Sequence, residues 1–164
     1  MKQKVSDYIA DHIAEWGIRD VFTVTGGGAM HMNDAFGHHP KLHCTYQHHE
    51  QACAMAAEAY ARMDNRMAAV CVTTGPGATN AITGVLGGWM DSIPMLVFSG
   101  QARYATTVAA SGLKLRSMGV QECYIVPVVT SITKYAQMII HPEDIRYHLE
   151  KALYMAVNGR PGPV

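Results

Sequence analysis

The sequence predicts a doubly wound α/β fold, in which a parallel sheet carries helices on both faces. Short β-rich runs alternate with segments of helical period along the chain. Two of these runs, AAVCVT at 68–73 and MLVFSG at 95–100, are apolar on both faces, which is typical of strands in a parallel sheet covered on both sides. Glycine loops at 26–28 and 73–80 each join a strand to a helix. Alternation, two-sided strands and glycine turns therefore indicate the same class.

The first half of the chain opens with a surface helix. Apolar residues recur at helical spacing from Val5 to Trp16, and Gly17 follows where a left-handed C-cap is expected. The next residues predict two strands, each followed by a helix. In order, these are a strand at 19–24, a helix at 29–36, a strand at 41–46 and a helix at 49–63.

The second half continues the alternation and then loses its regular period. An unpatterned stretch after the fourth strand predicts a long loop with about one helical turn, and acidic residues in a first turn mark the start of the last helix. In order, we expect a strand at 68–73, a helix from the second glycine loop to about Met90, a strand at 95–100, the loop at 101–122, a strand at 128–135 and a helix from His141 to about Val157.

The final residues have the composition of a turn. The segment from Asn158 to Pro163 is rich in glycine and proline, and Val164 stands where another strand would begin. We therefore expect residues 1–164 to be one domain from a longer polypeptide.

Composition narrows the class of partner. The 164 residues are 49% hydrophobic, and Lys plus Arg equals Asp plus Glu at 13 each, so we expect no nucleic-acid surface and no polybasic membrane tether. The apolar region 81–98 is interrupted by Asp91 and Pro94, and the N-terminus shows no signal-peptide pattern. We expect a cytoplasmic protein whose four cysteines, none in a C-x-x-C pair, are reduced core thiols.

The helix at 49–63 begins with a carboxylate. At helical spacing, Glu50 heads an alanine stripe, whereas Glu58 and Arg62 form an i,i+4 pair on another face. Glu50 has two interpretations: an acid favoured by the helix dipole, worth about 0.5 kcal/mol, or a partly desolvated carboxylate that awaits a ligand. The spacing does not choose between them.

A metal site is the alternative that the neighbouring residues suggest. The sequence His49-Glu50-Gln51-Ala52-Cys53 begins like the zinc motif H-E-x-x-H but has cysteine in the fifth place. The other histidines show no repeated ligand spacing. We therefore predict that this chain alone binds no metal.

The two glycine loops, 26–28 and 73–80, are candidate ligand sites because backbone amides at the carboxyl edge of a parallel sheet can face a ligand. Neither has the dinucleotide fingerprint or the P-loop pattern. Each loop alone is equally compatible with simple turn geometry. With Glu50 at a third strand end, a shared pocket becomes the better prediction.

Several motifs together resemble one family. HEQACAMAAEAYAR, TTGPGATNAITGVLGGWMDSIPMLVFSGQ and the terminal GRPGPV, with DVFTVTGGGAMHMNDAF and the pair Gln121-Glu122, occur in this order. In order and spacing they resemble the N-terminal, pyrimidine-binding (PYR) domain of thiamine-diphosphate-dependent enzymes of the acetolactate synthase type. The resemblance covers the whole chain and implies thiamine diphosphate as the cofactor, within a three-domain polypeptide.

The resemblance also implies roles for individual residues. The glutamate matching Glu50 hydrogen-bonds N1′ of the cofactor's aminopyrimidine and thereby promotes removal of the C2 proton. Gln121 matches a glutamine near the reacting centre. The aminopyrimidine pocket would be lined by Thr25, Gly26, Thr74, Gly75, Pro76 and Asn80.

What the family needs beyond this domain is also implied. Mg²⁺ and the diphosphate are held by a separate domain with a G-D-G…N motif, which does not occur in these 164 residues. That domain belongs to a partner subunit, so the resemblance implies a homodimer or homotetramer. The alanine face of the 49–63 helix is expected to pack at that boundary, and the isolated 164 residues are expected to be inactive.

The substrate is less closely specified. The family's D-A-F-Q-E is replaced by Met118-Gly119-Val120-Gln121-Glu122, Gly27 stands where simple decarboxylases place an acid, and residues 101–122 contain no histidine. The expected reaction is decarboxylation or carboligation of pyruvate or a related 2-keto acid. The alternatives are a stand-alone PYR subunit of a split 2-keto acid decarboxylase, acting with a separate diphosphate-binding subunit, and a generic nucleotide-binding domain.

Overall fold

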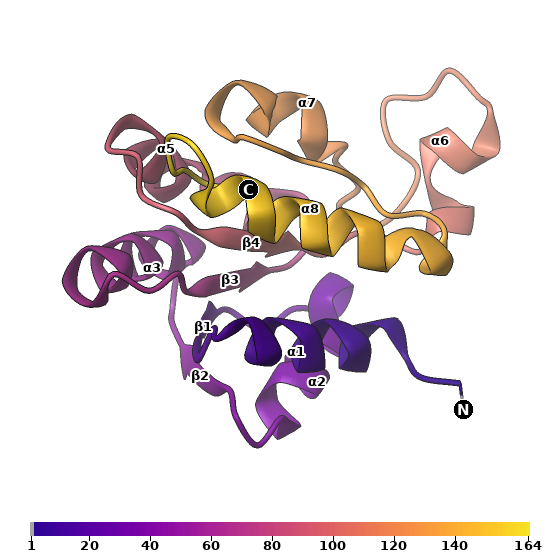
Figure 1. The fold of residues 1–164 in the computed structure, drawn as a ribbon. Helices are drawn as coiled ribbons and strands as arrows, with labels where there is room; N and C mark the ends of the chain where they lie inside the picture. The colour runs from indigo at the N-terminus through magenta and orange to yellow at the C-terminus, as the bar shows by residue number, and fades with distance from the viewer. Residues whose placement is uncertain (1) are drawn as a thin grey trace.

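The computed structural model describes residues 2–164 and contains a four-stranded, all-parallel sheet in the order β2-β1-β3-β4 (Figure 1). The register is continuous across the sheet, since Phe22 pairs with both Thr45 and Val70, and Val70 pairs with Val97. This arrangement confirms the predicted α/β class. The strands are β1 (Asp20–Thr23), β2 (His43–Tyr46), β3 (Ala69–Val72) and β4 (Leu96–Ser99).

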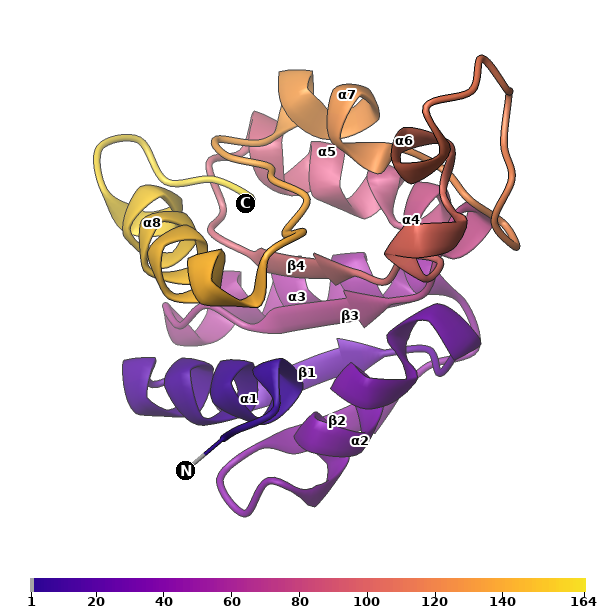
Figure 2. The same ribbon diagram turned by 90° about the vertical axis from the view of Figure 1, so that its right-hand side faces the viewer.

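Helices cover both faces of the sheet (Figures 1 and 2). The principal ones are α1 (Val5–Trp16), α2 (Met30–His38), α3 (Glu50–Asp64), α4 (Pro76–Asn80), α5 (Ile82–Met90) and α8 (Ile145–Val157). Shorter turns are η1 (Gly27–Ala29), η2 (Tyr104–Thr106), α6 (Val108–Ser111), α7 (Ile125–Val129), η3 (Thr130–Ile132) and η4 (Pro142–Asp144).

Strand β3 divides the core into two layers. Its residues Ala69 and Cys71 pack with α1, α2 and α8, whereas Val70 and Val72 pack with α3, α4 and α5. All four side chains are buried, because successive residues of a strand point to opposite faces and both faces are covered. The two-sided apolar pattern of the sequence is thus explained by the layering.

The predicted end of the first helix is confirmed, whereas two later segments differ from the prediction. Gly17 is left-handed with φ 104°, and its N–H closes α1 on Ala14 and Ile13. The predicted helix to Met90 is interrupted at Ala81, whose N–H bonds the Ala78 carbonyl, so that α4 and α5 are separate helices. Residues 101–122 hold two short turns, η2 and α6, where one was expected.

The strand predicted at 128–135 is wrong, because most of this stretch is helical, in α7 and η3. The Thr130 hydroxyl donates to the Val126 carbonyl at 2.7 Å, and the Thr133 hydroxyl donates to the Val129 carbonyl at 2.9 Å. These bonds stabilise helical turns in residues of high β-propensity, which tertiary context overrides.

The predicted last helix and the turn after it agree with the structure. Helix α8 ends at Val157, and the turn after it brings Pro163 into a parallel bridge with Met95 beside β4. This contact is an isolated bridge, and residues 158–164 form no strand of their own. Among residues 2–164, no helix is long and apolar enough to cross a membrane.

Candidate functional site

The carboxyl ends of parallel strands meet at one edge of the sheet, where ligands bind in this class of fold. β1 leads there into the first glycine loop, β2 into the start of α3, and β3 into the second glycine loop. Because β1 lies between β2 and β3, all three connections are neighbours in space. The topology therefore gathers the predicted residues at one place.

Glu50 lies half-buried at the first position of α3, with its two carboxylate oxygens in different surroundings. Oε2 accepts a hydrogen bond of 2.9 Å from the Asn80 side-chain amide at the end of α4. Oε1 lies beside Gly77, where a Cβ atom would approach it to 3.2 Å. Within residues 2–164, no hydrogen bond reaches Oε1. One oxygen is thus fixed and the other is available.

His49 and Cys53, which belong to the segment that resembles a zinc motif, have structural roles in α3. The His49 ring is the N-cap of α3, because Nδ1 accepts from the Gln51 N–H at 3.1 Å. Burial, and secondarily the charge of Glu50, raises the pKa of the Cys53 thiol to about 12. A histidine engaged in capping and a neutral buried thiol are poor metal ligands.

The alanine stripe of α3 packs inside the chain. Ala54 and Ala57 are fully buried against the sheet and α5. A Cβ at Gly84 of α5 would lie 2.5 Å from the Ala54 Cβ, so the two helices approach closely at this point. The expectation that this face packs on a partner domain is wrong, because α5 occupies it. The close packing instead fixes α3 relative to the segment that carries Asn80.

The second glycine loop adopts a conformation that requires glycine. Gly75 has φ 54° and ψ −115°, and a Cβ there would lie 2.2 Å from the Gln121 carbonyl oxygen. Pro76 begins α4, a position where its missing N–H is harmless, and Thr74 is buried behind it. Gln121, itself left-handed at φ 55°, is thereby seated directly on this loop. The structure brings these predicted residues together.

Glu122 holds the loop that carries Gln121. Its carboxylate accepts from the backbone N–H groups of Val108 at 2.8 Å and of Met118 and Gly119 at 2.9 Å each. These bonds, led by that from Gly119, lower the pKa of the carboxyl. The sequence showed the Gln-Glu pair but not this role, which joins residues fourteen positions apart.

The first glycine loop is attached through a residue that sequence reasoning missed. The Gly28 N–H donates to the Thr73 hydroxyl at 3.1 Å, and a Cβ at Gly26 would lie 2.4 Å from the Thr73 Cβ. Thr25 is exposed, and within residues 2–164 no hydrogen bond joins it to Glu50. Among residues 2–164, Thr25 and Gly26 therefore make no hydrogen bond to the Glu50 carboxylate. In the sequence, Thr73 is only the first residue of the second glycine loop, and nothing there indicates its link to the first loop.

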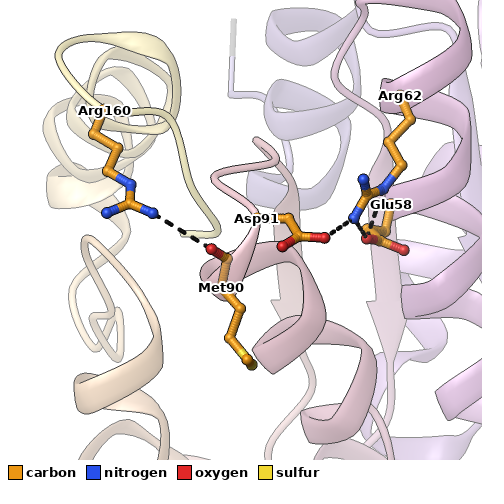
Figure 3. A network of polar contacts seen from close by, with 5 residues as sticks. All are labelled: Glu58, Arg62, Met90, Asp91 and Arg160. Carbon is orange, nitrogen blue, oxygen red and sulfur yellow. Dashed lines mark hydrogen bonds and ion pairs between the residues drawn. The ribbon is translucent and has the colours of Figure 1, made fainter.

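The C-terminal end of α3 carries a charged surface cluster (Figure 3). Arg62 Nε donates to Glu58 at 2.9 Å, which confirms the predicted i,i+4 pair, and Arg62 also contacts Asp91 after α5. Arg160, in the C-terminal turn, bonds the Met90 carbonyl at 3.4 Å. Glu58 therefore has a surface role that Glu50 does not share.

Comparison with known proteins identifies the family of the chain. Residues 3–114 match the family described as thiamine pyrophosphate enzyme, N-terminal TPP binding domain. The chain is 35% identical over 165 residues to acetolactate synthase 2, chloroplastic, of Zea mays, a match that covers 99% of the chain and 24% of the relative. Identity is 36% over 159 residues both to the acetolactate synthase large subunit of Haemophilus influenzae and to the isozyme 3 large subunit of Escherichia coli, in each case over 97% of the chain and 26% of the relative.

The chain thus spans about a quarter of the length of these relatives. The resemblance predicted from its motifs is confirmed by both comparisons. The chain belongs to the thiamine pyrophosphate enzyme family, as an N-terminal TPP-binding domain of the acetolactate synthase type.

Proposed function

We propose that this chain is the pyrimidine-binding part of an acetolactate-synthase-like enzyme that decarboxylates or carboligates pyruvate or a related 2-keto acid, with Glu50 activating the cofactor through N1′. Residues 1–164 would then be the N-terminal domain of a longer, three-domain chain. The observation that carries the proposal is the asymmetric carboxylate of Glu50, which has one oxygen bound by Asn80 and one open beside Gly77.

The residues present fit an aminopyrimidine ring. A ring nitrogen that shares a proton needs a carboxylate acceptor in a partly desolvated place, and Glu50 is half-buried with Oε1 free of partners among residues 2–164. Gly77 leaves the approach to Oε1 open, since a Cβ there would crowd that oxygen. These features support the interpretation of Glu50 as a ligand-binding carboxylate over the helix-dipole alternative.

Each residue then has a defined task. Asn80 donates to Oε2 and so orients the Glu50 carboxylate, while Oε1 holds the proton shared with N1′. When bound, thiamine diphosphate supplies the carbon nucleophile that attacks the keto acid and the ring that takes up electrons on decarboxylation. Gly75 allows the left-handed turn of the second glycine loop, on which the Gln121 backbone packs, and this loop would form part of the pocket. Thr25, Gly26, Thr74 and Pro76 would complete the walls.

The proposal assigns the remaining parts of the active site to other domains. Mg²⁺ and the diphosphate would be held by a diphosphate-binding domain of a partner subunit, in a cytoplasmic homodimer or homotetramer. Among residues 2–164, no group of three metal-ligating side chains is close enough to hold an ion. The isolated 164 residues are accordingly expected to turn over no pyruvate.

Glu50→Gln in the full-length enzyme is the direct test. The amide keeps the size of the side chain but removes its capacity to hold the proton, so we expect turnover of pyruvate to fall by about 10²- to 10⁴-fold. Glu58→Gln, in the same helix but in the surface ion pair, is the matched control and should retain turnover. Equal activity of the two variants would contradict the assignment.

A further inference from the structure

Thr73, the residue that follows β3, lies between the two glycine loops and contacts both. A Cβ at Gly26 in the first loop would lie 2.4 Å from the Thr73 Cβ, and one at Gly28 would lie 3.2 Å from its Oγ1. A Cβ at Gly77 in the second loop would lie 2.6 Å from its Cγ2. None of the three glycines has a positive φ, so here the missing Cβ serves close approach and not backbone conformation. The two loops are therefore shaped around one side chain.

The hydroxyl group of Thr73 holds the first loop. Oγ1 accepts a hydrogen bond of 3.1 Å from the Gly28 N–H. Gly28 lies in η1, which leads into α2, and the N–H groups of a first helical turn have no acceptor within their own helix. A side chain without an acceptor at position 73 would leave this N–H unpaired and would release the first loop from the second.

The methyl group of Thr73 holds the second loop beside Glu50. The space that a Gly77 side chain would fill is bounded by this methyl group and, at 3.2 Å, by Glu50 Oε1. Gly77 belongs to α4, which also carries Asn80, the donor to Glu50 Oε2. The contact between the methyl group and Gly77 therefore sets how α4 lies on the end of β3, and α4 lies next to both oxygens of the carboxylate.

Threonine is the side chain that meets both demands at once. Branching at Cβ restricts χ1, so the hydroxyl and the methyl group keep fixed directions. Serine would keep the hydroxyl but leave the space beside Gly77 unfilled. Valine would keep the size and the methyl group but offer no acceptor to the Gly28 N–H. Two conservative substitutions thus separate the two contacts.

We propose that Thr73 is a positioning residue of this site, whose hydroxyl fixes the first glycine loop and whose methyl group fixes α4 beside the Glu50 carboxylate. This rests on the proposed function, in which Glu50 Oε1 shares a proton with the cofactor and the first loop forms part of the pocket. A misplacement of about 1 Å in such a site can cost about 10²-fold in rate. Thr73 acts through Gly28 and Gly77, so its two contacts should have separate effects.

The test measures three quantities in the full-length enzyme: amide exchange at Gly28, the Kd of thiamine diphosphate with Mg²⁺, and exchange of the C2 proton at saturating cofactor. Thr73→Val should speed Gly28 exchange and raise the Kd by about tenfold each, because the bond that anchors the loop is lost. Thr73→Ser should leave Gly28 exchange and the Kd within about twofold of wild type. It should slow C2 exchange by about tenfold, and by more than Thr73→Val does, because α4 loses its contact.

Thr130, an exposed threonine whose hydroxyl bonds the Val126 carbonyl, is the matched control, and Thr130→Val and Thr130→Ser should leave all three quantities unchanged. The proposal is overturned if both Thr73 variants change the three quantities in the same proportion, as loss of general stability would, or if neither differs from wild type. If Thr73→Val does not fold, Thr73→Ser decides alone, since unchanged affinity with slower exchange is required.

Failure here is distinct from failure of the proposed function. Wild-type C2 exchange in Glu50→Gln contradicts the proposed function, whereas wild-type exchange in Thr73→Ser, with Glu50→Gln slow, contradicts only the role of Thr73.

Discussion

Gly84 of α5 is the residue whose enlargement should most clearly disturb the packing that positions Glu50. In Gly84→Ala, the new Cβ would lie 2.5 Å from the Ala54 Cβ and 2.8 Å from the Met55 backbone nitrogen. Carbon atoms in contact prefer about 3.5–4.0 Å, so α3 and α5 must separate by about 1 Å. Because the obstacles are a backbone atom and the shortest of side chains, neither can rotate away.

The expected cost follows from two opposing contributions. Overpacking of a well-filled core costs about 3 kcal/mol at the upper end of its usual range, which suits a collision with backbone. Alanine recovers about 1 kcal/mol of helix propensity relative to glycine. We therefore expect Gly84→Ala to lower the free energy of unfolding by about 2 kcal/mol.

Gly87, one turn further along α5, is the matched control. A Cβ at Gly87 meets nothing within 4 Å, so Gly87→Ala should gain about 1 kcal/mol of helix propensity without a penalty. Urea unfolding followed by circular dichroism measures both variants, and an unchanged slope shows that the unfolded state is the same. A Gly84→Ala protein as stable as Gly87→Ala would refute the close α3–α5 packing.

Three further changes probe the surroundings of the site. Glu122→Gln weakens the bonds that hold the loop and should speed tryptic cleavage at Lys114 and Arg116; slow cleavage unchanged from wild type would argue against the clamp. The pKa of Glu122 is lowered in the folded state, so its carboxylate contributes stability that is fully present above its ordinary pKa of 4.5. This stability is lost as the pH falls through the lowered value. Amide exchange of Gly119, measured against pH, would reveal the loss. Gly75→Ala places a Cβ 2.2 Å from the Gln121 oxygen at φ 54°, and the backbone strain alone should cost about 1–3 kcal/mol in urea unfolding, an expectation that wild-type stability would contradict. Burial raises the pKa of Cys71 to about 12, so iodoacetamide at pH 8 should modify this thiol only after unfolding, and rapid modification of the native protein would show that β3 is accessible.

The parts of the fold that local pattern controls were predictable from the sequence. The apolar residues on both faces of β3 predicted that this strand lies between two core layers. The spacing of Glu58 and Arg62 predicted their ion pair. Gly17 marked the end of α1 because left-handed backbone favours glycine. Such features depend on residues within one or two turns of each other.

The parts that depend on distant residues were not predictable in this way. Helical period showed that the alanine stripe packs closely, but not that Gly84 of α5 is what it packs against. The role of Thr73 as a link between the loops, and of Glu122 as the support of Gln121, arises only when separate segments meet. At 128–135, β-propensity favoured a strand, whereas the packed structure selects helical turns.

The assignment of Glu50 as the residue that activates the cofactor is tested most directly by proton exchange at the cofactor itself. In the full-length enzyme with thiamine diphosphate and Mg²⁺ but no substrate, NMR after quenching measures the rate at which the C2 proton exchanges with deuterium. We expect Glu50→Gln to slow this exchange by about 10²-fold or more, with Glu58→Gln equal to wild type. Exchange in Glu50→Gln as fast as in wild type would contradict the assignment.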